Sequence, residues 1–465
     1  MTRAAQRGRQ ACRSLGRKKQ IAEHDGVHSA PGKEVIVKSR PLPGNAARRV
    51  IGTTLAAFSL LLCLLPGLSE AERGELSTYI TSIDDTTEIS ESLLADIDSR
   101  LAQDPTDLTL LSDRALVLAA MGRVDAALET AALAIELSPE EPEGYVATSA
   151  LALYMEDYPR AIQYADIAIG LAPDSVDPYS VKILAAAAAG ELEAALDASR
   201  SMAELAPNDA NNYNTMATLE IQLGQYDDAY SHYTQALSLA PDSSGYLCNR
   251  GLLLMNLGQY DEALEDFDRA VSLDSTSANV YAIRSRYYAE TPYRDLEMAL
   301  QDLTRAIELE PENSLRYRQR AAVHYYRLGD FQATIEDMDR AVAVDPANPE
   351  VVHARGVFYM EHGDLDAAMR DFDRALELDP DYAHVLVNRA SILYEAGFAG
   401  EALENLSRAV SIDSTYAHAY YFRGTIYEEQ GELERARADY ESCLQSTEDP
   451  MLQMYVQAAL SRMSR

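Results

Sequence analysis

The stretch PEVVHARGVFYMEHGDLDAAMRDFDRALELDP, residues 349–380, decides the fold. Read as a helix, its first half places Val352, Gly356 and Tyr359 on one face, at the i, i+4, i+7 spacing of an amphipathic helix. Gly363 then ends this helix, because glycine is the residue most often found just past a helix C-terminus. The first half of the stretch therefore predicts one short helix with a single apolar face.

The second half predicts another helix. Ala368, Phe372 and Ala375 share a face at the same spacing, and Pro380 ends the helix because the residue before a proline disfavours the α region. Gly356 and Ala368 have almost no side chain, so the two helices can approach closely while Phe372 fills the remaining gap. The stretch thus predicts a helical hairpin that cannot bury its own apolar face alone.

The sequence repeats this hairpin, mostly at a spacing of 34 residues. The position of Gly356 is small in every copy except Ile183, and the position of Ala368 is alanine in every copy except Thr334. Glycine recurs at the turn, and proline recurs at the end of most copies. The small residues that match Gly356 are Ala115, Ser149, Ala217, Gly251, Ser285, Ala322, Ala390 and Gly424.

In these positions the chain resembles the tetratricopeptide repeat family, in ten copies over residues 108–448. The resemblance implies an all-α fold, a right-handed superhelical solenoid of antiparallel helix hairpins, with a concave groove lined by the first helix of each repeat. It also implies a scaffold that binds proteins, since the family carries no chemistry of its own.

Charge is distributed unevenly along the 465 residues. Residues 1–49 contain 12 Lys and Arg and 3 Asp and Glu, whereas the whole chain has a formal net charge of −34. The remainder is therefore strongly acidic, which should repel nucleic acid and attract basic partners. Solubility or adaptation to salt explains the same composition, because acidic residues on helices usually lie on solvated faces.

The N-terminal region reads as a targeting segment. Residues 1–49 form a basic leader that we expect to be disordered, and the uncharged apolar run at 50–65 is short of the roughly 20 residues that span a bilayer. Residues 50–71 therefore fit a secretory signal peptide cleaved after Ala71. A signal anchor retained over residues 50–68, a twin-arginine signal and an organellar transit peptide remain alternatives.

Both ends of the repeat array are predicted to be capped, since a solenoid must shield the open faces of its terminal repeats. Residues 72–106 combine a polar linker with an N-terminal capping helix. Residues 449–465 form a C-terminal capping helix with Pro450 in its first turn.

From residue 244 onward most repeats pair an arginine before the small residue of the first helix with an acid or asparagine in the second. Arg355 and Asp371 are one such pair, for which we predict a partly buried ion pair across the hairpin. Repeat seven is predicted to be an exception, because Asp337 is matched there by Ala321.

Repeats six and seven depart from the pattern and carry the predicted binding site. Their spacings are 36 and 35 residues, and arginines and tyrosines are interleaved between 281 and 327. These are the residue types enriched at binding hot spots, and arginine binds carboxylates bidentately. The family's geometry places five of them in the groove as a site for an acidic or C-terminal peptide: Arg286, Arg316, Arg320, Tyr326 and Arg327. Charge balance and packing between repeats explain the same residues.

No enzyme is expected, because the chain has no phosphate-binding loop, HExxH, paired CxxC or GxSxG motif. No cofactor is expected either. His353, His384 and His418 fall on the predicted groove side, but first helices about 10 Å apart are too distant for a tight shared ligand set, so we predict no metal.

The sequence therefore predicts a secreted or periplasmic scaffold that binds a protein or peptide in its groove. The alternative is a membrane-anchored structural organiser that holds its repeats outside the cytoplasm and touches the membrane only through residues 50–68. An enzyme hidden in the groove is the remote alternative.

Overall fold

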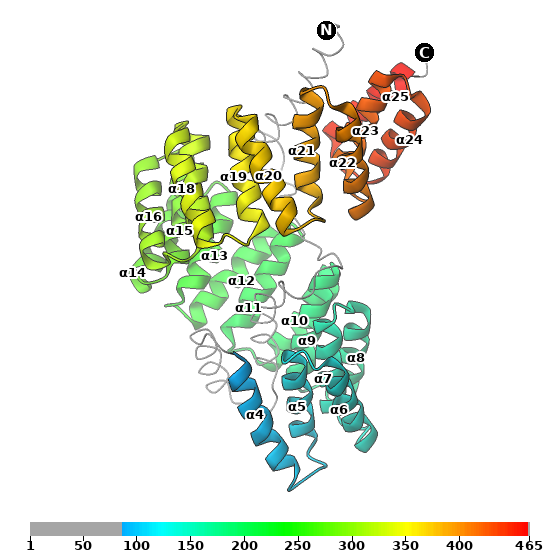
Figure 1. Ribbon diagram of the computed structural model, residues 1–465. Coiled ribbons are helices and arrows are strands. Elements are labelled where there is room, and N and C mark those ends of the chain that lie inside the picture. Colours follow the sequence, from blue (N-terminus) through cyan, green and yellow to red (C-terminus); the bar gives the residue numbers. More distant parts are fainter. Residues whose placement is uncertain (1–85, 464–465) are drawn as a thin grey trace. The chain divides into compact units, whose positions relative to one another are not determined.

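The computed structural model describes residues 86–463, which form 22 α-helices and one short π-helix. No strand occurs within this range. The chain divides into two compact units inside one helix, α14, and the described parts of these units are residues 86–266 and 267–463. Figure 1 shows the helices in chain order from α4 to α25.

The first unit contains an initial helix followed by hairpins. Its helices are α4 (Thr86–Leu101), α5 (Leu108–Ala120), α6 (Val124–Leu137), α7 (Glu143–Tyr154), α8 (Tyr158–Leu171), α9 (Asp177–Ala189), α10 (Leu192–Leu205), α11 (Ala210–Gln222), α12 (Tyr226–Leu239), α13 (Ser244–Asn256) and the first part of α14 (Tyr260–Leu273).

The second unit continues the same alternation and ends in a single helix. Its helices are the rest of α14, α15 (Ala278–Glu290), α16 (Leu296–Leu309), α17 (Ser314–Val323), the π-helix η1 (His324–Leu328), α18 (Phe331–Val344), α19 (Pro349–His362), α20 (Leu365–Leu378), α21 (Ala383–Glu395), α22 (Ala399–Ile412), α23 (Ala417–Gln430), α24 (Leu433–Gln445) and α25 (Pro450–Met463).

Each unit is a stack of helical hairpins. The first helix of a hairpin packs against the second, as α19 does against α20, and the second packs against the next first helix, as α20 does against α21. The fold is therefore an all-α solenoid of helical hairpins, as the sequence predicts. Residues 1–85 lie outside the described range, so the leader and the apolar run at 50–65 stay predictions. Among the described helices, none is long and apolar enough to span a membrane.

The hairpin at 349–380 has the geometry that its small residues permit. Ala368 and Phe372 are fully buried. A Cβ atom added to Gly356 would lie 2.7 Å from Cε1 of Phe372, a separation that real Cβ atoms do not tolerate. Gly363 ends α19 with a φ of +95°, and the next amide, that of Asp364, donates to the carbonyl of Tyr359. Only a residue free of Cβ strain adopts that left-handed turn readily.

A recurring arginine clamps most of the later hairpins. The predicted pair Arg389–Asn405 is the exception, because Asn405 bonds the carbonyl of Glu401 and Arg389 lies 3.1 Å from Asp373 of the preceding repeat. Arg355 in α19 donates from Nε and Nη2 to both carboxylate oxygens of Asp371 in α20, at 2.9 and 2.8 Å. Asp371 is buried, and the two parallel bonds are the bidentate geometry that makes Arg–carboxylate pairs strong. Arg250, Arg284 and Arg423 hold Asp266, Asp302 and Asp439 in the same way.

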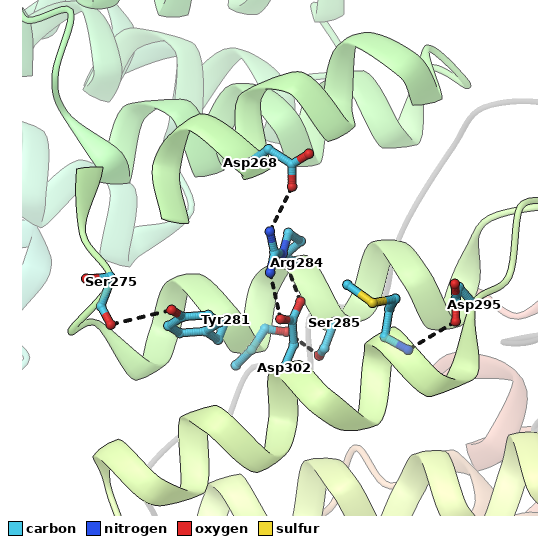
Figure 2. Close-up of polar contacts among 9 residues, drawn as sticks. Asp268, Ser275, Tyr281, Arg284, Ser285, Asp295 and Asp302 are labelled. Carbon is cyan, nitrogen blue, oxygen red and sulfur yellow. Dashed lines mark hydrogen bonds and ion pairs between the residues drawn. The ribbon is translucent and has the colours of Figure 1, made fainter. Parts of the chain in front are cut away.

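The clamp also joins neighbouring repeats, which the sequence did not predict. The remaining nitrogen of Arg355, Nη1, donates at 2.8 Å to Asp339 in the second helix of the preceding repeat. Arg284 bonds Asp268 at 2.8 Å on one side and Asp302 on the other, as Figure 2 shows. One guanidinium therefore closes its own hairpin and stacks that hairpin on the previous one.

Repeat seven carries the clamp in a register that differs from the predicted one. Arg320, and not residue 321, donates to both oxygens of Asp337 at 2.9 and 2.7 Å. The small buried residue of the first helix is Ala321, whereas Ala322 is half-buried. The π-helix η1 causes the difference, because its wider turn absorbs the one residue that this repeat has in excess.

The Arg355 clamp can be tested by a mutant cycle. Arg355→Met and Asp371→Ala should each destabilise the fold by about 3 kcal/mol, because each strands a poorly solvated charge. The double variant should lose clearly less than the sum, as measured by urea unfolding.

The exposed partner provides the control for this cycle. Asp339 keeps more than half of its side chain exposed, so Asp339→Ala should cost about 1 kcal/mol or less. Additive losses for Arg355 and Asp371 would show that the two side chains do not act as a pair.

Candidate binding surface

The structure gives two of the four predicted site arginines strong internal partners. Arg316 is 5% exposed, and its Nε donates at 2.8 Å to Glu310 just before its own helix. Arg320 forms the clamp with Asp337, and its Nη1 donates at 2.9 Å to Thr304 of the preceding repeat. Both guanidinium groups therefore have structural contacts that a ligand would have to break.

The other three predicted residues lie in α15 and in η1. Arg286 is exposed on α15 and approaches Glu290 one turn later at 3.5 Å. Tyr326 and Arg327 lie in η1 and are half-buried. The ring of Tyr326 packs against Tyr325, with centroids 5.0 Å apart, and against Phe358 of α19, at 5.8 Å. Tyr326 therefore already has aromatic contacts within the fold, whereas Arg286 keeps an exposed guanidinium.

Successive first helices meet through polar side chains 35 residues apart. In the first unit Asn249 donates to Asn214 at 2.9 Å. In the second unit the amide nitrogen of Asn388 lies 2.8 Å from Nε2 of His353, and the hydroxyl of Tyr394 donates to Glu429. We call the surface formed by these contacts the first-helix face.

Arg318 is the cation of this face in α17. It is half-buried, and its side chain makes no hydrogen bond or ion pair within residues 86–463. The positive charge of Arg318 helps to lower the pKa of His353 in α19. It also partly opposes the rise in the pKa of Tyr382, just before α21. Burial is the larger cause for His353 and brings its pKa to about 4. His353 is therefore neutral near pH 7, which leaves Arg318 as the local positive charge.

Tyrosines alternate with three histidines next to Arg318. The ring of Tyr382 lies 5.1 Å from His353 and 6.1 Å from His384. Tyr416 lies 4.7 Å from His384 and 6.4 Å from His418 in the next repeat. The histidines pack against rings, and across the described residues no group of three or more His, Cys, Asp or Glu side chains could hold a metal ion.

Glu361 is the most perturbed carboxylate of the first-helix face. Burial in α19 raises its pKa to about 7, and hydrogen bonds from Tyr326 and Tyr325 only partly oppose that rise. The π-helix produces this arrangement, because it places two tyrosines in succession beside the next first helix. Tyr326 thus contributes to the surface by holding Glu361.

The raised pKa of Glu361 predicts a pH-dependent stability. The folded state binds the Glu361 proton more tightly than the unfolded state does. Above about pH 7 the ionised carboxylate destabilises the fold, and the fold becomes more stable as the pH falls from about 7 towards 4.5. Glu361→Gln should therefore stabilise the fold by about 1–2 kcal/mol at pH 8 and by less than half of that at pH 5.

Urea unfolding of wild type and variant at the two pH values measures this difference. Glu441→Gln, at an exposed position of α24, is the control and should show no such change between the two pH values. An equal effect of Glu361→Gln at pH 8 and pH 5 would contradict the assignment.

Comparison with known families agrees with this architecture. Residues 160–389 match the family described as the ETO1 C-terminal domain, and residues 350–464 match a tetratricopeptide repeat-like domain. The chain carries tetratricopeptide-like repeat domains. These matches support the assignment of the chain as a tetratricopeptide repeat protein. No curated protein sequence matches the chain.

Solved structures of tetratricopeptide repeat proteins are also similar. A tetratricopeptide repeat protein from Parabacteroides merdae is 19% identical, with 55% of this chain and 99% of that chain covered and a TM-score of 0.41. YrrB, described as having an unusual peptide-binding site, is 23% identical over 40% of this chain and 95% of its own, with a TM-score of 0.31.

The human IFIT1 dimer with PPP-AAAA is 15% identical over 85% of this chain and 95% of that one, with a TM-score of 0.44. At these scores the similarities support no transfer of function.

Sequence reasoning missed the residues that connect the repeats on the first-helix face: Arg318, Glu361, Asn388, Tyr394 and Glu429. The sequence pattern that marks them is a pair of polar residues 35 positions apart, one position more than the 34-residue repeat length. That offset arises because a side chain on one first helix meets the next position on the neighbouring one.

Proposed function

We propose that the chain is an exported scaffold that binds a protein or peptide segment on the first-helix face of α17, α19 and α21. The tetratricopeptide-like fold supports a protein–protein interaction scaffold. One observation carries the specific site: the half-buried guanidinium of Arg318, without a partner among residues 86–463, beside the His353–Asn388 contact.

A partly buried cation without a counterion is unfavourable, because it loses water without gaining a charged partner. The other arginines of α17 are already bound, Arg316 to Glu310 and Arg320 to Asp337. Arg318 is therefore the guanidinium in this helix that is free to bind a carboxylate. An acidic or C-terminal peptide supplies such a group and fits the proposal.

This proposal includes no catalytic step and no cofactor. It also excludes nucleic acid as a partner, because a net charge of −34 repels a phosphate backbone. Export rests on the signal-like residues 50–71, which precede the described range, and points to a secreted or periplasmic protein.

The apolar run at 50–65 favours a second candidate, a membrane-anchored organiser with its repeats outside the cytoplasm. Fractionation of cells that express the full-length chain distinguishes the two. Exported protein should be released from membranes by a high-salt wash, whereas anchored protein should stay in the pellet until detergent is added.

The binding site is tested by a pull-down from native extract with the full-length chain. Arg318→Glu should lose the captured partner, because it replaces the cation of the site with a carboxylate. Arg370→Glu is the matched control, since it makes the same charge change at an exposed position of α20 and should retain the partner.

Unfolding curves for both variants should match that of the wild type. A partner retained equally by Arg318→Glu and Arg370→Glu would place binding elsewhere on the molecule.

A further inference from the structure

The helix α22 begins at an unusual residue. Three other second helices of this unit begin with an aspartate whose carboxylate accepts a backbone N–H: Asp295, Asp330 and Asp364, at 3.0, 3.0 and 3.1 Å. Phe398 occupies this N-cap position in α22, where no side-chain hydrogen bond caps the helix. Aspartate is among the preferred N-cap residues, whereas a large apolar side chain caps nothing. The fold itself therefore gains nothing in capping from a phenylalanine here.

The ring of Phe398 is also left in water. It is 54% exposed, and small residues that are themselves exposed lie on both sides of it, Gly397 and Gly400. In the corresponding turn of the next repeat, Leu433 is 47% exposed at the start of α24. Because α22 packs against α23, which leads into that turn, these two apolar side chains belong to adjacent turns on one edge of the second unit.

Carboxylates flank these two apolar side chains in the sequence. Glu395, the last residue of α21, is half-buried and has no partner among the described residues. An acidic side chain in the last turn of a helix is opposed by the helix dipole, so Glu395 is not explained by helix stability. Glu401 and Glu434 lie in the first turns of α22 and α24, and the nearby Arg435 is held by Glu432 at 2.7 Å.

We propose that this edge, formed by Phe398, Leu433, Glu395, Glu401 and Glu434, docks a basic amphipathic helix of a partner protein. The apolar stripe of such a helix covers the two exposed side chains, and the lysines or arginines beside the stripe face the carboxylates. The same carboxylates repel anionic lipid and nucleic acid, so charge complementarity selects a basic protein segment.

The proposal goes beyond the function of the first-helix face and uses different residues. Arg318 on that face selects a carboxylate, whereas this edge selects cations. The two sites can therefore fail separately, and a variant of one serves as the control for the other.

The test measures the affinity of the full-length chain for a fluorescent 18-residue helix in which leucine and lysine are segregated to opposite faces. A peptide of the same composition in scrambled order controls for non-specific attraction to an acidic protein. Fluorescence anisotropy should show at least tenfold tighter binding of the segregated peptide, weakened by added salt.

Phe398→Asp should weaken binding of the segregated peptide at least tenfold. The variant adds a carboxylate and the preferred N-cap residue, so neither lost charge nor unfolding can explain the loss. Leu133→Asp removes another exposed apolar side chain, from α6 in the first unit, and should bind as the wild type does. Arg318→Glu should also bind the peptide normally.

Glu395→Gln combined with Glu401→Gln should weaken binding and flatten its salt dependence while Phe398 is unchanged. Equal affinities of wild type and Phe398→Asp would overturn the proposal, as would equal binding of the segregated and scrambled peptides. A wild-type dimer that Phe398→Asp dissociates in sedimentation experiments would assign the edge to a second copy of the chain and overturn the basic partner.

Discussion

The arginine clamp is the interaction that ties most of the later hairpins together. In α19 the guanidinium of Arg355 holds a buried carboxylate of its own hairpin and an exposed one of the repeat before. The planar fork of arginine makes this possible, since a lysine cannot bond one carboxylate bidentately and reach another. Lys182 occupies the same position in an early repeat and bonds backward to Asp166, while its own hairpin has Ala198 where the later ones have an aspartate. Where the clamp is present, one side chain therefore closes a hairpin and also bonds the preceding repeat.

Keeping this clamp in register explains the π-helix. Repeat seven has one residue more than the repeats that follow it, and an α-helix of uniform pitch would move either Arg320 or the turn out of position. The wider turn of η1, which follows Arg320 in the chain, accommodates the extra residue. The clamp between Arg320 and Asp337 is therefore retained. The same turn places Tyr325 and Tyr326 against Glu361. A structural constraint in one helix thus creates the perturbed carboxylate of the next.

The hairpins were predictable because they depend on properties that a sequence displays directly. Gly356 and Ala368 are small, Gly363 permits the left-handed turn, and the i, i+4, i+7 spacing shows which face is apolar. The contacts between repeats were not predictable in the same way. They depend on the direction that a long side chain takes. Arg316 points inward to Glu310 and is buried, whereas Arg318, two residues later, has no hydrogen-bonded or ion-pair partner in the described part of the chain. Repeat periodicity assigns both to one helix and does not distinguish them.

Three residues depart from what stability alone would select. Arg318 is a half-buried cation without a counterion among residues 86–463. Glu361 is a carboxylate whose burial disfavours its charge, and Phe398 is an exposed ring at a position that suits aspartate. Departures of this kind are expected where a surface serves a partner rather than the fold. They differ in sign and chemistry, since Arg318 suits an anion and the edge around Phe398 suits an apolar group flanked by cations. A solenoid can tolerate such departures, because each repeat is stabilised by extensive packing against its neighbours and a few unfavourable residues cost little of that total.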